Sequence, residues 1–217
     1  MNRAELKANA KVQIKGKIGI LFLITVIIAV VSSVAGFVLG LIPVVGSIAA
    51  AVIVTPAFSL SLIRVYMNVV NGGEPAAGDS FSGFDDFWSA FKVTFLTGLY
   101  TFLWSLLFVI PGIVKGLSYS MAMYILAENK GKSARECINE SKKMTDGHKA
   151  ELFVLGLSFI GWALLGCLTF GIVYIWAVPY MQATYTNAYY YLKSLIAPEV
   201  EPVEEAPAVE AAVAENE

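Results

Sequence analysis

The chain has 217 residues, of which 57% are hydrophobic and only 15% are charged, and its mean hydropathy is +0.68. A soluble globular domain contains about 25% charged residues, so this composition excludes an ordinary soluble protein. Between Lys17 and Arg64 the chain runs for 46 residues without an Asp, Glu, Lys or Arg. A membrane-spanning helix needs about 20 apolar residues, so this run alone is long enough for two crossings and a turn. The sequence therefore predicts an integral membrane protein.

The net charge of −2 combines two regions of opposite sign. Residues 197–217 contain seven Glu and no Lys or Arg, whereas the rest of the chain has 15 basic and 10 acidic residues. An excess of positive charge is usual on the cytoplasmic loops of membrane proteins, so it gives no reason to expect a nucleic-acid partner. The acidic end is too poor in large apolar residues to fold. We expect a transmembrane domain over residues 1–195 and a disordered acidic cytoplasmic tail over 196–217.

A surface helix and a first hairpin are predicted over residues 1–70. Basic and apolar residues alternate up to Lys17, which is typical of an amphipathic helix on a membrane surface. Two spans follow at about 18–41 and 47–70, joined by a turn at residues 42–46. The basic start imitates a cleaved secretory signal, but the uncharged run continues to Ile63, so we expect an uncleaved first span.

A second surface helix and a third span are predicted over residues 71–110. Four aromatic residues recur at i, i+3, i+4 and i+7 and so share one helical face: Phe84, Phe87, Trp88 and Phe91. The third span follows at 93–110, and the pair Pro111 and Gly112 is expected to break it.

The next segment, residues 113–127, has only five Ile, Leu or Val and contains Lys115. These five favour insertion by about 2 kcal/mol, which a Lys at the membrane centre would cancel. Six basic residues between 128 and 149 nevertheless indicate a cytoplasmic loop, and the basic N-terminus is cytoplasmic too. An even number of crossings must separate them, so 113–127 is expected to return through the membrane. A re-entrant or steeply tilted segment is the alternative.

The third unit begins with a predicted amphipathic helix over residues 133–149, where Ser133 and Glu136 have the spacing of a capping box. Spans follow at about 150–167 and 171–192. The expected fold is all-α: a polytopic membrane helix bundle of six transmembrane helices in three hairpins, each preceded by an amphipathic interfacial helix, with both termini cytoplasmic. The threefold repetition is a hypothesis, because few residues are identical and coarse hydropathy can repeat by chance.

Polar residues on the returning helices are the best functional candidates. Residues of this kind inside a membrane usually face the bundle interior or a watery cavity. The set comprises Arg64, Asn68, Lys115, Gln182 and Thr186. They are interpreted either as anchors and interhelical contacts or as the lining of a polar path. The three tyrosines at 189–191 are expected to form an aromatic belt at the membrane surface.

Lipids and other membrane proteins are the expected partners. Contacts with lipid headgroups are predicted for basic and aromatic residues on the cytoplasmic side: Lys11, Lys15, Lys17, Trp88, Lys142 and Lys143. Small residues Ser32, Gly36 and Gly40 recur every fourth position and allow another helix to approach, either from this chain or from a partner copy.

Nothing in the sequence indicates an enzyme. We predict no catalytic, metal or cofactor residues, because no zinc motif, phosphate-binding loop or dinucleotide fingerprint is present. The single histidine, His148, lies in a predicted cytoplasmic loop. Cys137 and Cys167 have no metal-binding spacing and would lie at opposite ends of a span, so a disulfide is not expected.

Several stretches resemble one known family. They are LWSLLFVIPGIVK at residues 103–115, SYSMA at 118–122, MTDGHK at 144–149, ELF at 151–153, LSFIGW at 157–162, FSGF at 81–84 and PY at 179–180. The chain resembles, over residues 1–192, the bacterial multi-pass family catalogued as domain of unknown function 975. Met123 departs from the proline expected there. The resemblance implies an integral membrane protein without an established activity.

The leading functional hypothesis is a non-enzymatic membrane protein that organises other proteins or interacts with lipid. The competing hypothesis is a small-solute or lipid transporter, in which Arg64, Asn68, Lys115 and Gln182 line the route. No Asp or Glu lies within the core of any predicted span, and a proton-coupled pump usually needs one, which disfavours the transporter.

Overall fold

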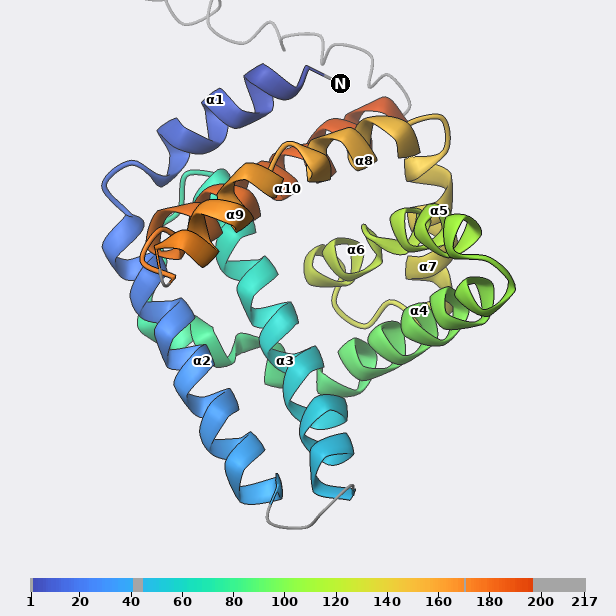
Figure 1. Ribbon diagram of the computed structural model, residues 1–217, viewed down its shortest axis with the longest axis horizontal. Helices are drawn as coiled ribbons and strands as arrows, with labels where there is room; N and C mark the ends of the chain where they lie inside the picture. The colour runs from blue at the N-terminus through green and yellow to red at the C-terminus, as the bar shows by residue number, and fades with distance from the viewer. Residues whose placement is uncertain (1, 41–44, 170, 197–217) are drawn as a thin grey trace, which may run out of the picture.

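The computed structural model in Figure 1 describes residues 2–40, 45–169 and 171–196. These residues form helices and no strand, which confirms the all-α class. Most of the predicted first turn and the predicted acidic tail lie outside the described residues.

The elements follow one another as α1 (Arg3–Ile14), α2 (Ile18–Gly40), α3 (Val45–Val70), the 3-10 helix η1 (Ala77–Phe84), α4 (Phe87–Leu107), α5 (Val109–Tyr119), α6 (Ala122–Glu128), α7 (Ala134–Thr145), α8 (Lys149–Leu157), α9 (Ile160–Leu168) and α10 (Tyr174–Ile196). This order contains three units. Each has a short leading helix (α1, η1 or α7) and a hairpin (α2 with α3, α4 with α5 and α6, or α8 and α9 with α10).

The leading helices α1 and α7 have the same local structure. Both have 12 residues, and their N-cap side chains Asn2 and Ser133 accept a hydrogen bond from the backbone N–H three residues later. The predicted capping box of Ser133 and Glu136 is present. Each helix is followed by a three-residue turn that contains a glycine in the left-handed region, Gly16 (φ 82°) or Gly147 (φ 79°). An L side chain is disfavoured at this φ, so glycine is required where the surface helix turns into the hairpin.

The last helices of the first and third units also match. Pro56 and Pro179 lie inside α3 and α10, and ten residues later each helix carries a tyrosine with almost no exposed surface, Tyr66 and Tyr189. One turn after each proline, a hydroxyl group donates to the carbonyl four residues back, from Ser61 in α3 and from Thr184 in α10. The structure therefore supports the predicted internal repeat for these two units.

The three units close into a ring. Each leading helix packs against the last helix of the preceding unit: η1 against α3, α7 against α6, and α1 against α10. The last helices meet at the centre, where α3 contacts both α6 and α10. This cyclic packing explains why the leading helices are amphipathic, because each one covers a neighbouring unit with its apolar face.

The buried residues concentrate at this junction, which we call the central core. It contains the apolar face of α1, the start of α2, the C-terminal halves of α3 and α10, and the buried sides of α6 and α7. Its largest fully buried side chains include Tyr66, Tyr189, Leu21, Ile24, Ile125, Leu126 and Ile138. In α1 the core-facing residues are Leu6, Ala10 and Ile14, whereas Val12 is 73% exposed.

The far parts of the hairpins, which we call the hairpin tips, expose apolar side chains. They comprise residues 30–38, 102–106, 108–113, 160–169 and 171–176, with Phe37, Leu106, Ile110, Leu164 and Leu168 all at least 66% exposed. Figure 1 shows that the hairpins diverge: α2 and α3 extend downward, α4 and α5 extend to the right, and α9 meets α10 on the left. The three hairpins are therefore not parallel.

The six-span bundle is not supported by the structure. Among the described residues, three helical stretches are long and apolar enough to cross a membrane: Ile18–Val38, Val109–Glu128 and Lys149–Leu168. The second stretch is interrupted after Tyr119, and the third is interrupted at Ser158 and Phe159. The segment 113–127 is helical as expected, but it is divided between α5 and α6.

Two predicted boundaries were wrong. The aromatic surface helix over residues 84–91 is instead the end of η1 and the start of α4, where Phe87, Trp88, Phe91 and Phe95 stack in succession. The third span ends at Leu107, before Pro111. Proline has no N–H for the carbonyl four residues back, so Pro111 is accommodated in the first turn of α5, where that N–H is not needed.

Candidate functional site

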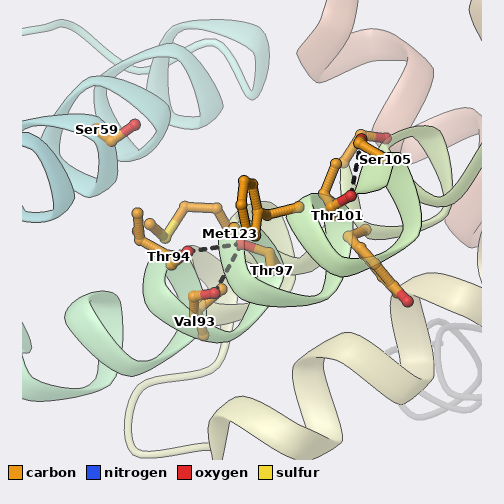
Figure 2. Close-up of a pocket in the computed structure, with 12 residues that line it drawn as sticks. Ser59, Val93, Thr94, Thr97, Thr101, Ser105 and Met123 are labelled. Carbon is orange, nitrogen blue, oxygen red and sulfur yellow. Dashed lines mark hydrogen bonds between the residues drawn. The ribbon is translucent and has the colours of Figure 1, made fainter. Parts of the chain in front are cut away.

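A cavity of about 620 Å³ lies beside α4, and we call it the α4 groove. It is walled by α3, α4, α5 and the start of α6. Its lining residues are Ser59, Val93, Thr94, Thr97, Gly98, Thr101, Phe102, Ser105, Gly116, Tyr119, Ser120 and Met123. Every polar side chain in this set is a hydroxyl, and none is charged. Figure 2 shows Ser59 across the groove from the hydroxyl groups of α4.

The helical period of α4 aligns these hydroxyl groups. Thr94, Thr97, Thr101 and Ser105 are spaced at i, i+3, i+7 and i+11, which places them on one face of the helix. The hydroxyl of Thr97 donates to the carbonyls of Val93 (2.8 Å) and Thr94 (3.0 Å), and Ser105 donates to the carbonyl of Thr101 (2.9 Å) (Figure 2). Because these protons point to the backbone, the hydroxyl oxygens are left as acceptors.

Two glycines keep the groove open. A Cβ atom added at Gly98 would meet nothing within 4 Å, and one added at Gly116 would meet only the methyl group of Thr101 at 3.6 Å. At the inner end, Tyr119 packs against Tyr100 with 6.1 Å between ring centroids. The ammonium group of Lys142 lies 5.6 Å from the centroid of the Tyr119 ring. Sequence reasoning missed this groove, although the spacing of the α4 hydroxyls was a visible signal.

Arg64 and Asn68, two of the predicted polar residues, bind the segment that follows α3. Arg64 donates to the carbonyl of Ser82 (2.5 Å) and forms an ion pair with Asp86, and Asn68 donates to the carbonyl of Glu74 (3.1 Å). Arg64 and Asn68 also line a cavity of about 210 Å³ together with Val65, Asp79 and Ser82. These contacts support the interpretation of Arg64 and Asn68 as anchors.

The other predicted polar residues lie elsewhere. Lys115 on α5 places its ammonium group 4.8 Å from the centroid of the Trp104 ring. Thr186 is buried in α10, where its hydroxyl donates to the carbonyl of Gln182 (3.0 Å). Neither Lys115 nor Gln182 lines the cavity at Arg64. The residues come from three diverging hairpins, so the structure gives no support to a common polar path.

The predicted headgroup contacts divide into exposed and packed residues. Lys11, Lys15, Trp88, Lys142 and Lys143 are exposed, and Lys17 is half-buried. Lys11 lies 5.6 Å from the centroid of the Tyr180 ring, and Lys17 donates to the carbonyl of Gly73 (2.7 Å). A further basic residue, Lys7, lies over the Phe159 ring, and its pKa is lowered first by burial and then by the charges of Arg3 and Lys11.

The stripe of small residues on α2 has no close neighbour at Gly36, because a Cβ atom added there would meet nothing within 4 Å. Ser32 is half-buried, and Gly40 is the last residue of α2. The stripe is therefore not used for close packing within the chain at Gly36.

Of the three tyrosines in the predicted aromatic belt at residues 189–191, Tyr189 lies away from the surface. Tyr189 is 1% exposed and donates to the Glu128 carboxylate (2.6 Å), which also binds Lys193 (2.6 Å). The Tyr190 hydroxyl accepts a hydrogen bond from Asn71 (2.8 Å). These side chains join α10 to the other last helices, because the end of α10 belongs to the central core.

Groups capable of chemistry are scattered. The structure describes no group of three or more His, Cys, Asp or Glu side chains that would hold a metal ion in the part of the chain it covers. His148 pairs with Glu151 across 2.8 Å. Cys137 and Cys167 are both free, and burial raises the pKa of the Cys137 thiol to about 11. The hydrogen bond that Lys132 donates to the Glu140 carboxylate raises the pKa of Lys132.

Comparison with known proteins identifies a family that this chain resembles. The model of a family described as "Protein of unknown function (DUF975)" matches residues 1–115 and 106–195. No curated protein and no solved structure matches the chain. The two matched ranges include all three units and exclude the acidic end.

Proposed function

Since the chain belongs to this family of unknown function, DUF975, we propose from its own geometry that it is an integral protein of the cell membrane without catalytic activity, which interacts with lipid and with other membrane proteins. In this proposal the hairpin tips lie in lipid, and the central core lies at the cytoplasmic surface with both termini. The six segments enter and leave the bilayer as three hairpins.

The distribution of exposed apolar side chains carries the proposal. Large apolar residues on the tips are exposed in succession, for example Phe108 (72%), Val109 (71%) and Ile110 (75%). A soluble monomer rarely exposes contiguous apolar patches larger than a few hundred Å², and larger ones mark membrane or protein contacts. Charged residues instead accompany the core, on α1 and α7 and in the loop after α6. Three separate apolar tips around one charged core favour a bilayer as the common partner.

Cysteine labelling tests the topology. Single cysteines at Gly46, Phe108 and Thr169, in a chain without the native thiols, should react with a membrane-impermeant maleimide added outside intact cells. A cysteine at Lys143 is the matched control and should react only after permeabilisation. Labelling of any tip only from inside would overturn the three-hairpin arrangement.

The lipid contact is tested with two exposed lysines of α7, Lys142 and Lys143. Basic residues near an anionic surface contribute about 1 kcal/mol each. The double change Lys142→Glu and Lys143→Glu should lower the preference for anionic over zwitterionic vesicles at least tenfold in flotation. The Lys142→Arg and Lys143→Arg control should keep it. An unchanged preference would remove the headgroup contact, and solute or lipid flux in proteoliposomes would favour the transporter instead.

A further inference from the structure

We propose that the α4 groove binds the neutral, hydroxyl-bearing headgroup of a membrane lipid, such as that of diacylglycerol. The proposal rests on the membrane location inferred above, and it adds a specific ligand class at a defined place.

The size and position of the groove suit such a ligand. Its volume of about 620 Å³ lies within the range of small-molecule sites, about 300–1,000 Å³. Its lining follows α4 from Val93 to Ser105, a length of about 18 Å along a helix. The inner end lies beside the central core at Val93 and Met123, and the outer end reaches the exposed Phe102 (64%) on the hairpin tip. A lipid can therefore place its headgroup against the hydroxyls and its acyl chains along the apolar tip.

The chemistry of the lining selects a neutral headgroup with donors. Along α4 the groove offers hydroxyl groups and no charged side chain, and the Lys142 ammonium group lies at the inner end, against the Tyr119 ring. A phosphate or an ammonium group bound along α4 would therefore lose hydration without an ionic partner. The hydroxyls of Thr97 and Ser105 donate to backbone carbonyls, which leaves their oxygens to accept hydrogen bonds. A free hydroxyl of the ligand supplies the matching donor, which an esterified headgroup without hydroxyls lacks.

A lipid fits the groove better than the helix of a second copy does. An α-helix with its side chains is about 10 Å across and requires an open face. Here the hydroxyl face of α4 is flanked by Ser59 of α3 on one side and by Gly116 and Tyr119 of α5 on the other. A groove with a wall on each side admits a narrow headgroup and a chain.

The test fills the groove from Gly98, where an added side chain enters open space without a clash. The purified full-length protein, in detergent micelles, is incubated with dioleoylglycerol or dioleoylphosphatidylglycerol, and bound lipid is counted by native mass spectrometry. Gly98→Leu should lower dioleoylglycerol binding at least tenfold, and Thr101→Val should lower it severalfold because it removes one hydroxyl at constant shape. Gly161→Leu is the matched control on α9, where an added Cβ atom also meets nothing within 4 Å, and should bind as the unmodified chain does.

Three results would overturn the proposal: equal binding by Gly98→Leu, binding of dioleoylphosphatidylglycerol as tight as that of dioleoylglycerol, or disulfide crosslinks between copies through cysteines at Thr101.

Membrane extraction separates this proposal from the proposed function. If Gly98→Leu remains in the membrane fraction and loses the lipid, the site is specific; if the unmodified chain leaves the membrane on alkaline washing, the membrane location itself is wrong.

Discussion

The central core and the hairpin tips are built from similar apolar residues but in opposite environments. Ile125 on α6 is fully buried, whereas Ile110, one helix earlier, is 75% exposed. In a water-soluble protein the exposed apolar side chains of the tips would be unfavourable, because burial of apolar surface drives folding. Here the leading helices cover only the core. The comparison teaches that this chain stabilises one region by its own packing and leaves the apolar side chains of the other exposed.

The polar contacts follow the same division. Side chains of the core join different units, as Tyr189 and Lys193 join α10 to Glu128 at the end of α6. On the tips, hydroxyls bond within their own helix or hairpin, as Ser105 does to Thr101 and Tyr174 does to Ala163. The core therefore fixes how the units are arranged, and the tips have few polar contacts that would fix their direction.

The largest difference is expected between truncations of Ile125 and Ile110. Ile125→Ala leaves a cavity in the core and should lower the free energy of unfolding by about 2–5 kcal/mol. Ile110→Ala removes an exposed side chain and should change it by about 0.5 kcal/mol or less in detergent micelles. Denaturant titration followed by circular dichroism measures both values. Equal losses would show that the tips pack as the core does.

Removing a tyrosine hydroxyl from the core and another from a tip tests the same difference between the two regions. Tyr189→Phe removes a hydroxyl that is itself buried, leaves the Glu128 carboxylate with Lys193 alone and should cost about 1.5–3 kcal/mol of stability, as for hydrogen bonds to charged groups. Tyr174→Phe removes an exposed 3.3 Å hydrogen bond on the tip and should cost about 0.5 kcal/mol or less. The same denaturant titration applies, and a larger effect at Tyr174 would contradict the division.

Glycine substitutions in η1 probe the contact between two units. A Cβ atom at Gly83 would overlap the backbone oxygen of Ala57 in α3, and Gly83 donates its N–H to the Ser61 hydroxyl (2.8 Å). Gly83→Ala should therefore cost about 1–3 kcal/mol by overpacking. At Gly78 in the same helix an added Cβ atom meets nothing within 4 Å, so Gly78→Ala is the control. Thermal unfolding in micelles should separate the two variants, and identical midpoints would mean that η1 does not pack on α3.

The smallest effect concerns the reactivity of the two cysteines. Cys167 on the third tip is exposed and should be alkylated by iodoacetamide in micelles within minutes. Cys137 is buried in α7 and its pKa is about 11, so about 0.1% is thiolate at pH 8. Its rate should rise about tenfold for each pH unit up to about pH 10, because only the thiolate reacts. Mass spectrometry of the modified peptides measures both rates; fast alkylation of Cys137 at pH 8 would show that α7 opens readily.

Local features were predictable because they depend on neighbouring residues. The capping box of Ser133 and Glu136 and the start of α2 at Ile18 both follow from sequence spacing. The end of α4 was misplaced because Pro111 acts on the carbonyl four residues earlier and not at its own position. The aromatic face at residues 84–91 was read as a separate helix because periodicity does not show where one helix stops.

The candidate sites were less predictable. The polar face containing Arg64 and Asn68 was visible in the sequence, but its ion pair with Asp86 comes from a segment whose docking depends on Gly83 and Ser61. The hydroxyl spacing on α4 was equally visible. The groove, however, exists only because Ser59 and Gly116 come from other helices.

The sequence by itself determined that the chain is helical and apolar in long stretches, because hydropathy and helical period are properties of consecutive residues. It also determined where the charges lie along the chain. Only the tertiary structure decided that each leading helix covers the unit before it, that the hairpins diverge, and that Tyr189 is buried in the core. These outcomes depend on contacts between residues far apart in the chain, for which shape complementarity and partner position matter more than the local pattern.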